Sequence, residues 1–371
     1  MDAQKITNLR VKLMKLAKSL RVSVIPPDAD LEKPQGVRDD TVLFEGKSLH
    51  RRRIVLLTPK CTSASCLMCP LPNEALDNRT ITPEQIIKQY DSCFGQPNDH
   101  EIETISLYTN GNFFADNEIP EVVKEHIYRH ISTTNAKYVL VESLPQFVNE
   151  QKLALAKKYL KDKVLITAIG LQSSSDLVRQ ISVNTTCTQE SFEKAYHLSR
   201  KFGFDIQAFL MIKPPFLTET EAINDCVDSI GYLYQLGIKN PTLCACRAAP
   251  NTVLDILRLD GKYHSPWLWT VAEVMTRSAE KYPQSVPMLV INELLSEKNL
   301  DSTVSHNCDE CSASVIQALV RFNADRNVAA LKSVTHTCYQ NYLQERKTED
   351  EFASTHSLVW RVEDFLTTHS L

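Results

Sequence analysis

The sequence predicts an α/β protein whose parallel sheet is either open or closed into a barrel. Two observations support this class: short apolar or β-branched runs alternate with amphipathic helical stretches, and the 371 residues are enough to bury a large core. Strands that alternate with helices need right-handed crossovers, which bring the carboxyl ends of all strands to one edge. We therefore expect chemistry-bearing residues where strands end.

Before the first strand of this alternation, the first twenty residues carry apolar side chains at helical spacing, surrounded by lysine and arginine. This pattern predicts a basic amphipathic helix, whose polar face is either simply solvated or binds nucleic acid or a partner. Residues 22–50 contain several prolines and charges and are expected to form an extended lead-in. We expect strands near 53–57, 104–108, 138–142, 164–169, 206–212 and 242–246, and helices near 83–93, 120–131, 150–159, 189–202 and 219–236.

Beyond about residue 293 the alternation gives way to helices and a group of cysteines and histidines. The sequence thus predicts three parts. They are an N-terminal helix and lead-in over 1–50, an α/β barrel over 51–292 and a C-terminal Cys/His module over 293–371.

Composition excludes several classes of function. The net charge of −4 gives no global field for phosphate backbones, so any nucleic-acid partner must use a local patch. No glycine pair has the spacing of a dinucleotide fingerprint or a P-loop. The chain has no run of 18 apolar residues and no apolar stretch at its start, so we expect a cytoplasmic protein with no membrane contact. Its eleven cysteines are then expected to be thiols or metal ligands.

Cys61, Cys66 and Cys69 lie between two prolines in the loop that follows the first barrel strand. Three thiolates at this spacing can converge on one metal centre. A structural zinc needs four ligands, whereas a 4Fe–4S cluster held by three cysteines leaves one iron open for a small molecule. The pattern favours the cluster; zinc with a distant fourth ligand is the alternative.

This chain resembles the radical S-adenosylmethionine (SAM) superfamily, in which SAM binds the open iron and is cleaved reductively to a 5′-deoxyadenosyl radical. Within it, the chain is similar to the radical SAM subunit of archaeosine synthase, a relative of the catalytic subunit of Elongator. The resemblance implies a partial (β/α)6 barrel of the TIM type. The segments that carry it are Cys66-Leu67-Met68-Cys69 and residues 107–113, 139–143, 168–172, 210–216 and 266–269.

The resemblance also implies roles for single residues. Cys61, Cys66 and Cys69 would hold the cluster, and the turn Thr109-Asn110-Gly111 would contact the methionyl amine of SAM through its backbone. Glycine suits a place where the chain approaches a ligand closely. A plain turn between strand and helix is the alternative, because the family's Gly-Gly-Glu turn is absent here.

Four further residues stand at or after strand ends. A carboxylate at Glu142 needs a partner, either a SAM hydroxyl or ammonium group or a salt bridge at the rim. Gln172, where relatives often carry glutamate, is expected to hydrogen-bond SAM or substrate. Arg179 either binds the SAM carboxylate or forms a surface ion pair. Lys213 either faces the substrate or covers apolar wall with its stem.

The C-terminal module contains a second metal-type pattern. Cys308 and Cys311 form Cys-x2-Cys, and His336 and Cys338 form His-x-Cys, which together supply the four ligands of a structural zinc. His306 could replace His336. A cysteine-rich helical cap and a second iron–sulfur cluster are the alternatives.

The sequence therefore predicts a radical SAM enzyme with a 4Fe–4S cluster, SAM and a structural zinc. The resemblance implies a flavodoxin or ferredoxin as reductant. It also implies a tRNA substrate in which a lysine adduct of a 7-deazaguanine base is cleaved to an amidine, with a partner protein supplying tRNA affinity. The alternatives are tailoring of a small metabolite and a non-catalytic, metal-stabilised RNA-binding or assembly protein.

Overall fold

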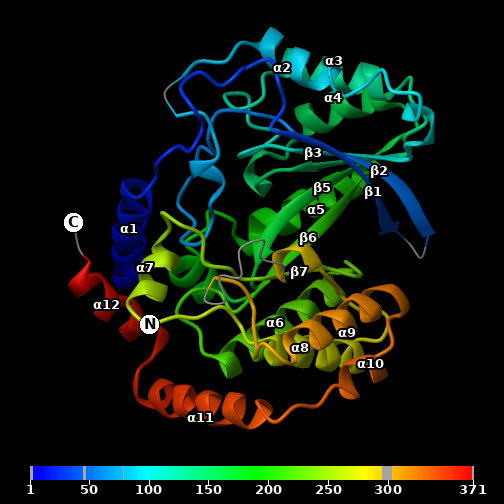
Figure 1. Cartoon of the computed structure of the whole chain (residues 1–371). Coiled ribbons are helices and arrows are strands. Elements are labelled where there is room, and N and C mark those ends of the chain that lie inside the picture. The colour runs from blue at the N-terminus through cyan, green and yellow to red at the C-terminus, as the bar shows by residue number, and fades with distance from the viewer. Residues whose placement is uncertain (1–2, 45–46, 78, 295–302, 370–371) are drawn as a thin grey trace.

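The computed structural model describes residues 3–44, 47–77, 79–294 and 303–369. One curved eight-stranded sheet runs through the molecule with its strands in sequence order (Figure 1). The first two strands are antiparallel and all later neighbours are parallel. The strands are β1 (Gly36–Phe44), β2 (Lys47–Val55), β3 (Thr104–Tyr108), β4 (Tyr138–Glu142), β5 (Val164–Gln172), β6 (Asp205–Ile212), β7 (Thr242–Ala245) and β8 (Met288–Leu289).

Helices cover the outer face of this open half-barrel (Figure 1). Three of those between strands begin at a threonine cap: the hydroxyls of Thr82, Thr188 and Thr218 each accept a hydrogen bond from a backbone N–H of the first turn. The α-helices are α1 (Ala3–Ser19), α2 (Pro83–Asp91), α3 (Glu121–Ile131), α4 (Glu150–Leu160), α5 (Gln189–Lys201), α6 (Glu219–Leu236), α7 (Val253–Leu259), α8 (Leu268–Lys281), α9 (Ser312–Asp325), α10 (Ala329–Lys332), α11 (Tyr339–Thr355) and α12 (Leu358–Thr368).

Strand alternation separates the main core from the concave side of the sheet. On β3, Ile105 and Leu107 belong to the large core beneath the helices, whereas Tyr108 packs with the smaller concave-side cluster around Leu140 and Ile166. The carboxyl ends of the parallel strands share one edge, as predicted. The α/β class and the partial barrel are confirmed.

The expected lead-in differs from the structure, because residues 36–44 and 47–55 form an antiparallel strand pair that extends the sheet. Two of its cross-strand pairs are oppositely charged: Asp39 lies opposite Arg52, and Asp40 lies opposite Arg51. The guanidinium of Arg52 is buried and donates two hydrogen bonds of 2.8 Å to Asp39. Pairing of this kind stabilises a charged strand that hydropathy does not reveal.

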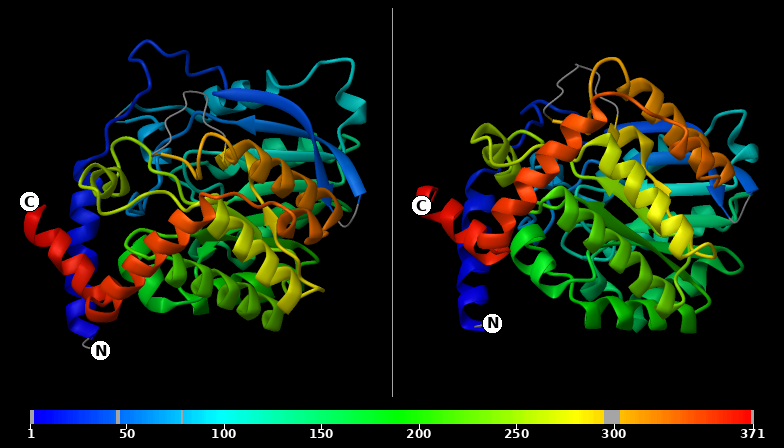
Figure 2. Two further views of the ribbon diagram at one scale, coloured as in Figure 1. Left: turned by 60° about the horizontal axis from the view of Figure 1, so that its bottom comes forward. Right: turned by 90° about the horizontal axis from the view of Figure 1, so that it is seen from below.

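The terminal helices lie side by side, and Lys5 of α1 pairs with Glu363 of α12 at 2.9 Å (Figure 2). The predicted boundary near residue 293 does not separate two cores. Buried residues of α9, such as Val315 and Leu319, belong to the same hydrophobic core as strands β3–β7. None of the helices in the described ranges combines the length and the apolar character needed to span a bilayer.

Candidate functional site

The loop with Cys61, Cys66 and Cys69 lies beyond the carboxyl end of β2 and is fixed to its neighbours by backbone hydrogen bonds. Its Cys61 N–H donates to the Asn110 carbonyl at 3.2 Å, and its Leu67 N–H donates to the Val183 carbonyl at 3.1 Å. All three half-buried thiols interact electrostatically with Arg21, and Cys61 and Cys69 both act on Cys66. The three thiols therefore lie in one neighbourhood around Arg21, and their role as cluster ligands stays a prediction.

Burial raises the pKa of Cys66 well above its ordinary range and that of Cys69 to about 11. Both thiols are therefore protonated at neutral pH while no cation is bound. Thiolates form at such positions only when a metal compensates the lost hydration.

Arg21 braces the cysteine loop from the α1 side. Its guanidinium donates hydrogen bonds of 2.7 Å to the carbonyls of Cys66 and Cys69. This role of Arg21 could not be predicted from the sequence, because Cys66 and Cys69 lie 45 and 48 residues away along the chain.

Glu118 braces the same loop from the β3 side, and it was not predicted either. Its buried carboxylate accepts hydrogen bonds from the Thr62 N–H at 2.8 Å and from the Thr62 hydroxyl at 2.7 Å. It also accepts from the backbone and side-chain N–H groups of Asn112, whose amide contacts the Cys61 sulfur at 3.4 Å. Glu118 stands directly after Asp116 and Asn117 in the sequence, so no local pattern distinguished it from an ordinary loop residue.

The Thr109-Asn110-Gly111 turn directly follows β3, and Thr109 and Asn110 are buried. Gly111 approaches protein atoms here: a Cβ would overlap Glu118 Oε2 and lie 2.9 Å from the Cys61 Cα. The glycine therefore lets the β3 loop and the cysteine loop close on each other. This packing role was not part of the sequence prediction, which invoked a ligand.

Glu142 ends β4, and burial raises the pKa of its carboxyl to about 7. It also interacts electrostatically with Cys69, so it lies toward the cysteine loop. At neutral pH this group exchanges readily between its charged and neutral forms.

Gln172 ends β5 in a left-handed conformation with φ 68°, where the pairing with β6 shifts register. Arg179 is buried, and its guanidinium is bound by the Asp176 carboxylate and by the Ser173 carbonyl at 2.5 Å. A SAM carboxylate would have to displace or share these partners.

Lys213 follows β6 and is fully buried, with φ 56°. Its ammonium group contacts Glu219 at 2.6 Å, His264 at 3.2 Å and Glu349 of α11 at 3.3 Å. These carboxylates keep the pKa of Lys213 above its ordinary value despite burial. Hydrogen bonds with Glu345 and Glu349 raise the pKa of His264 to about 9, although burial acts to lower it. The lysine thus joins the barrel edge to the C-terminal helices.

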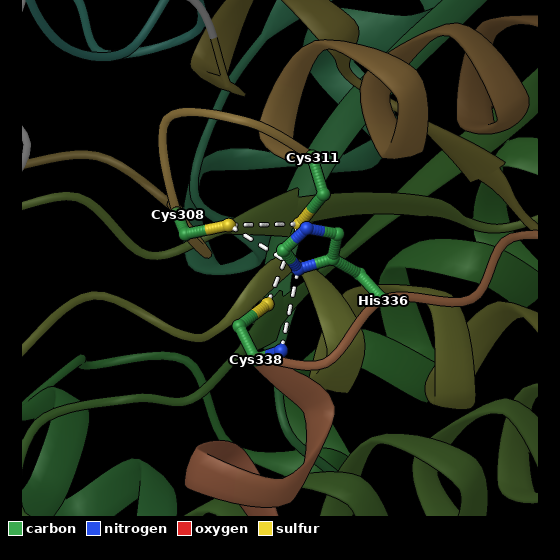
Figure 3. Close-up of side chains that lie close together, drawn as sticks. All are labelled: Cys308, Cys311, His336 and Cys338. Atoms are coloured by element: carbon green, nitrogen blue, oxygen red, sulfur yellow. Dashed lines mark hydrogen bonds between the residues drawn. The ribbon is translucent and has the colours of Figure 1, made fainter.

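The second predicted ligand group also converges (Figure 3). Ligand atoms of Cys308, Cys311, His336 and Cys338 all lie within 4.8 Å of one another. Sulfur–sulfur distances of 3.5 Å join Cys311 to Cys308 and to Cys338. Bonds of about 2.3 Å at tetrahedral angles would place sulfurs about 3.8 Å apart, so the geometry fits a tetrahedral metal centre.

His336 faces this centre with Nδ1, which lies 3.5 Å from the Cys308 sulfur, while Nε2 lies 3.0 Å from Glu310. A carboxylate behind a ligating imidazole is usual in metal sites, because it fixes the ring. Burial raises the pKa of Cys338 to about 12. Burial also acts to raise that of Cys308, but hydrogen bonds, chiefly with Cys311, bring it below its ordinary value.

No protein-family model matches the chain, but curated relatives do. An uncharacterised protein of Methanocaldococcus jannaschii is 29% identical over 77% of this chain and 78% of its own. Archaeosine synthase subunit beta of Methanosarcina acetivorans is 28% identical over 66% of this chain and 70% of its own. The same subunit of Thermococcus kodakarensis is 23% identical over 74% and 83%. These matches agree with the resemblance to the radical SAM subunit of archaeosine synthase that the sequence carries.

Solved structures also match part of the chain. Queuine lyase of Clostridium spiroforme, bound to SAM and queuine, matches 56% of this chain and 79% of its own at 17% identity, with a TM-score of 0.42. Elp3 of Methanocaldococcus infernus matches 64% and 57% at 14% identity, with a TM-score of 0.43.

The resemblance to the radical SAM superfamily implies an iron–sulfur cluster and SAM, and the residues at the strand edge of this chain fit them. Three thiols provide a soft donor set suited to iron. Beside them, Asn110 Oδ1 and Ser143 Oγ are buried and have no hydrogen-bond partner among the described residues. Buried polar atoms are normally paired, so these two are candidates to receive donors from a ligand.

Proposed function

We propose that the chain holds a 4Fe–4S cluster on Cys61, Cys66 and Cys69, cleaves SAM reductively there and modifies a 7-deazaguanine base in tRNA. The observation that supports the proposal is that these three free thiols share one loop beyond the carboxyl end of β2 and all interact electrostatically with Arg21. When bound, the cluster and SAM supply a carbon-centred radical that removes hydrogen from an unactivated carbon.

The protein's own residues position and shield this chemistry. Arg21 and Glu118 hold the cysteine loop by hydrogen bonds on its two sides. The unpaired Asn110 Oδ1 and Ser143 Oγ are placed to accept hydrogen bonds from the SAM ammonium and hydroxyl groups. Glu142, with its raised pKa, would lose its proton when that ammonium group approaches, because an opposite charge favours the carboxylate.

The substrate is proposed from the relatives, two of which are archaeosine synthase beta subunits. The reaction would convert the lysine adduct of the deazaguanine base to an amidine. The relatives' designation as subunits, together with the net charge of −4, supports a partner protein that contributes tRNA affinity. The eleven free cysteines support a reducing, cytoplasmic location.

We further propose that the C-terminal ligand group binds zinc in a structural role. Three sulfurs and one imidazole satisfy four tetrahedral positions and leave none open for substrate. The C-terminal module packs on the barrel through α9 and α11. The zinc would therefore stabilise α11, which contains Glu349, and with it the environment of Lys213.

The test is anaerobic reconstitution with iron and sulfide, followed by dithionite and SAM. We expect bound iron, SAM binding and 5′-deoxyadenosine. A triple Cys→Ala variant at positions 61, 66 and 69 should show none of these. Mass spectrometry of tRNA nucleosides with and without the gene then tests the substrate, and an unchanged nucleoside profile would indicate a small metabolite instead of tRNA. Absence of SAM cleavage by the reconstituted protein would refute the enzyme reaction itself.

A further inference from the structure

Helix α1 and the segment after it form the most one-sided charge region of the chain. Residues 3–27 contain six basic side chains and no acidic one, although the whole chain has a net charge of −4. The apolar side of α1 is buried: Ile6, Leu9, Leu13 and Leu16 pack in the same core cluster as Leu67 and Met68 of the cysteine loop. This helix is therefore a fixed part of the wall around the cysteines and cannot insert its apolar side into a membrane.

Three of the six cations are bound within the protein. Arg10 donates to the Thr185 carbonyl at 2.9 Å, Arg21 binds the carbonyls of two cysteine ligands, and Lys5 pairs with Glu363. The others, Lys12, Lys15 and Lys18, are exposed and form no ion pair with any part of the chain that the structure describes. Their spacing of three residues keeps them on one side of the helix over about 9 Å.

Exposed valines accompany these lysines. Val11 of α1 is 41% exposed and lies on the same helix side as Lys15 and Lys18, at spacings of four and seven residues. Beyond the helix, Val22 and Val24 are 57% and 62% exposed, and their backbone N–H groups are fixed by Asn73. We name the set Val11, Lys12, Lys15, Lys18, Val22 and Val24 the α1 patch.

The α1 patch is connected to the proposed cluster ligands by the side chain of Arg21. Arg21, between Lys18 and Val22 in the sequence, reaches the backbone of Cys66 and Cys69 directly. A protein that covers the patch would thus lie against the helix and the segment that contact the cysteine loop.

We propose that the α1 patch is the docking surface for a small acidic one-electron donor protein of the flavodoxin or ferredoxin class. The inference rests on the proposed function, since only a reductive reaction needs such a donor. In the encounter, the reduced donor loses one electron and the cluster bound to the cysteine loop gains it; no proton or group is transferred. Positive charge on the patch complements the acidic donor and accelerates its association.

The valines favour a protein over RNA as the occupant. Contacts to a phosphate backbone come from cations and hydrogen-bond donors, and exposed valines add nothing to them. A small apolar centre with charged residues around it is instead the composition of a transient protein interface, and electron-transfer complexes are at the small end of such interfaces.

The test compares two triple variants of the reconstituted full chain. K12Q/K15Q/K18Q removes the lysines of the α1 patch and keeps good helix formers. K47Q/K161Q/K239Q removes three exposed lysines: Lys47 begins β2, and Lys161 and Lys239 precede β5 and β7, so all three lie at the opposite edge of the same sheet. Binding of oxidised flavodoxin is measured by titration over a salt series, and 5′-deoxyadenosine formation is measured with reduced flavodoxin and, separately, with dithionite.

We expect K12Q/K15Q/K18Q to bind flavodoxin about tenfold more weakly at low salt, with a shallower salt dependence, whereas the control variant binds as the unmodified protein does. Flavodoxin-driven turnover should fall in parallel, and dithionite-driven turnover should stay unchanged. A V11S/V22S variant should weaken binding without changing the salt dependence.

Equal effects of the two lysine variants, or no effect of either, would overturn the inference. So would loss of affinity for a tRNA transcript in K12Q/K15Q/K18Q while flavodoxin binding persists, because the patch would then serve RNA. Failure of the unmodified protein to cleave SAM with dithionite would count against the proposed function instead, and the binding titration would still decide the docking surface.

Discussion

The carboxylate of Glu118 lies 2.8 Å from the Thr62 backbone nitrogen and thereby joins the loop after β3 to the loop that carries the cluster cysteines. The two residues are 56 positions apart in the sequence, and the bond closes one side of the site.

Replacing Glu118 tests this closure. Glu118→Ala leaves the N–H groups of Thr62 and Asn112 without their acceptor, so we expect a loss of about 2 kcal/mol in unfolding free energy and a marked loss of iron after reconstitution. Urea denaturation and an iron assay measure the two effects. Asn117→Ala, which removes only an exposed hydrogen bond to the Thr62 hydroxyl, is the control and should retain iron. Full iron in the Glu118 variant would contradict the assigned role.

Gly111→Ala tests the close approach of the same two loops. The new methyl group would overlap the Glu118 carboxylate and press on the Cys61 backbone, which cannot move without shifting a ligand. We expect reduced iron content and a lower Tm. Gly36→Ala is a matched control, because no atom lies within 4 Å of the added Cβ and its φ lies outside the left-handed region. Similar behaviour of the two variants would argue against the packing role.

The raised pKa of Glu142 makes stability depend on pH. The unfolded carboxyl ionises near its ordinary pKa of about 4.5, but the folded one stays protonated to about 7. Between these values the native state binds more protons than the unfolded state, so unfolding free energy must fall as pH rises and level off above about 7. Burial also raises the pKa of Asp225, to about 6, so its ionisation changes the unfolding free energy in the same direction. Glu142→Gln should flatten the slope between pH 5 and 7 in urea titrations; an unchanged slope would mean that Glu142 ionises normally.

The proposed zinc site predicts that replacing His336 and replacing His306 affect zinc content and Tm differently. His336→Gln removes a ligand, so we expect zinc loss and a lower Tm, because structural zinc contributes folding free energy directly. His306→Gln leaves all four ligands in place, since His306 contacts Ser312 and Asp309 instead. Zinc per chain, measured by atomic emission, separates the two. Zinc loss in the His306 variant alone would reassign the ligand set.

Lys213 allows structural and substrate roles to be separated. Lys213→Met leaves Glu219 buried without its cation, which we expect to cost about 3 kcal/mol. The double variant Lys213→Met/Glu219→Leu removes both charges and should recover most of this stability. If 5′-deoxyadenosine formation and tRNA modification both recover with stability, the lysine is structural. If the stable double variant still cleaves SAM but no longer modifies tRNA, Lys213 faces the substrate, which is one of the two roles considered from the sequence.

Local patterns in the sequence were sufficient for the strand and helix order, the cysteine loop and the Cys/His ligand group. Apolar periodicity and threonine caps act within one element, and Cys-x2-Cys spacing fixes ligand geometry within one turn, so neighbours in sequence carry the information. The β1–β2 hairpin escaped this reasoning because its stability comes from Asp–Arg pairs across strands, which look like solvated charge in a linear reading.

The tertiary structure alone decided which polar groups meet. Arg21, Glu118 and Glu349 reach the site from segments between 45 and 136 residues away, and only the folded backbone sets those distances. Burial is likewise a property of the fold: it raises the pKa of Glu142 and leaves Asn110 without a partner, although neither sequence neighbourhood differs from that of an ordinary strand end. The chain thus encodes its metal ligands locally, while the surroundings that make those ligands useful arise from long-range packing.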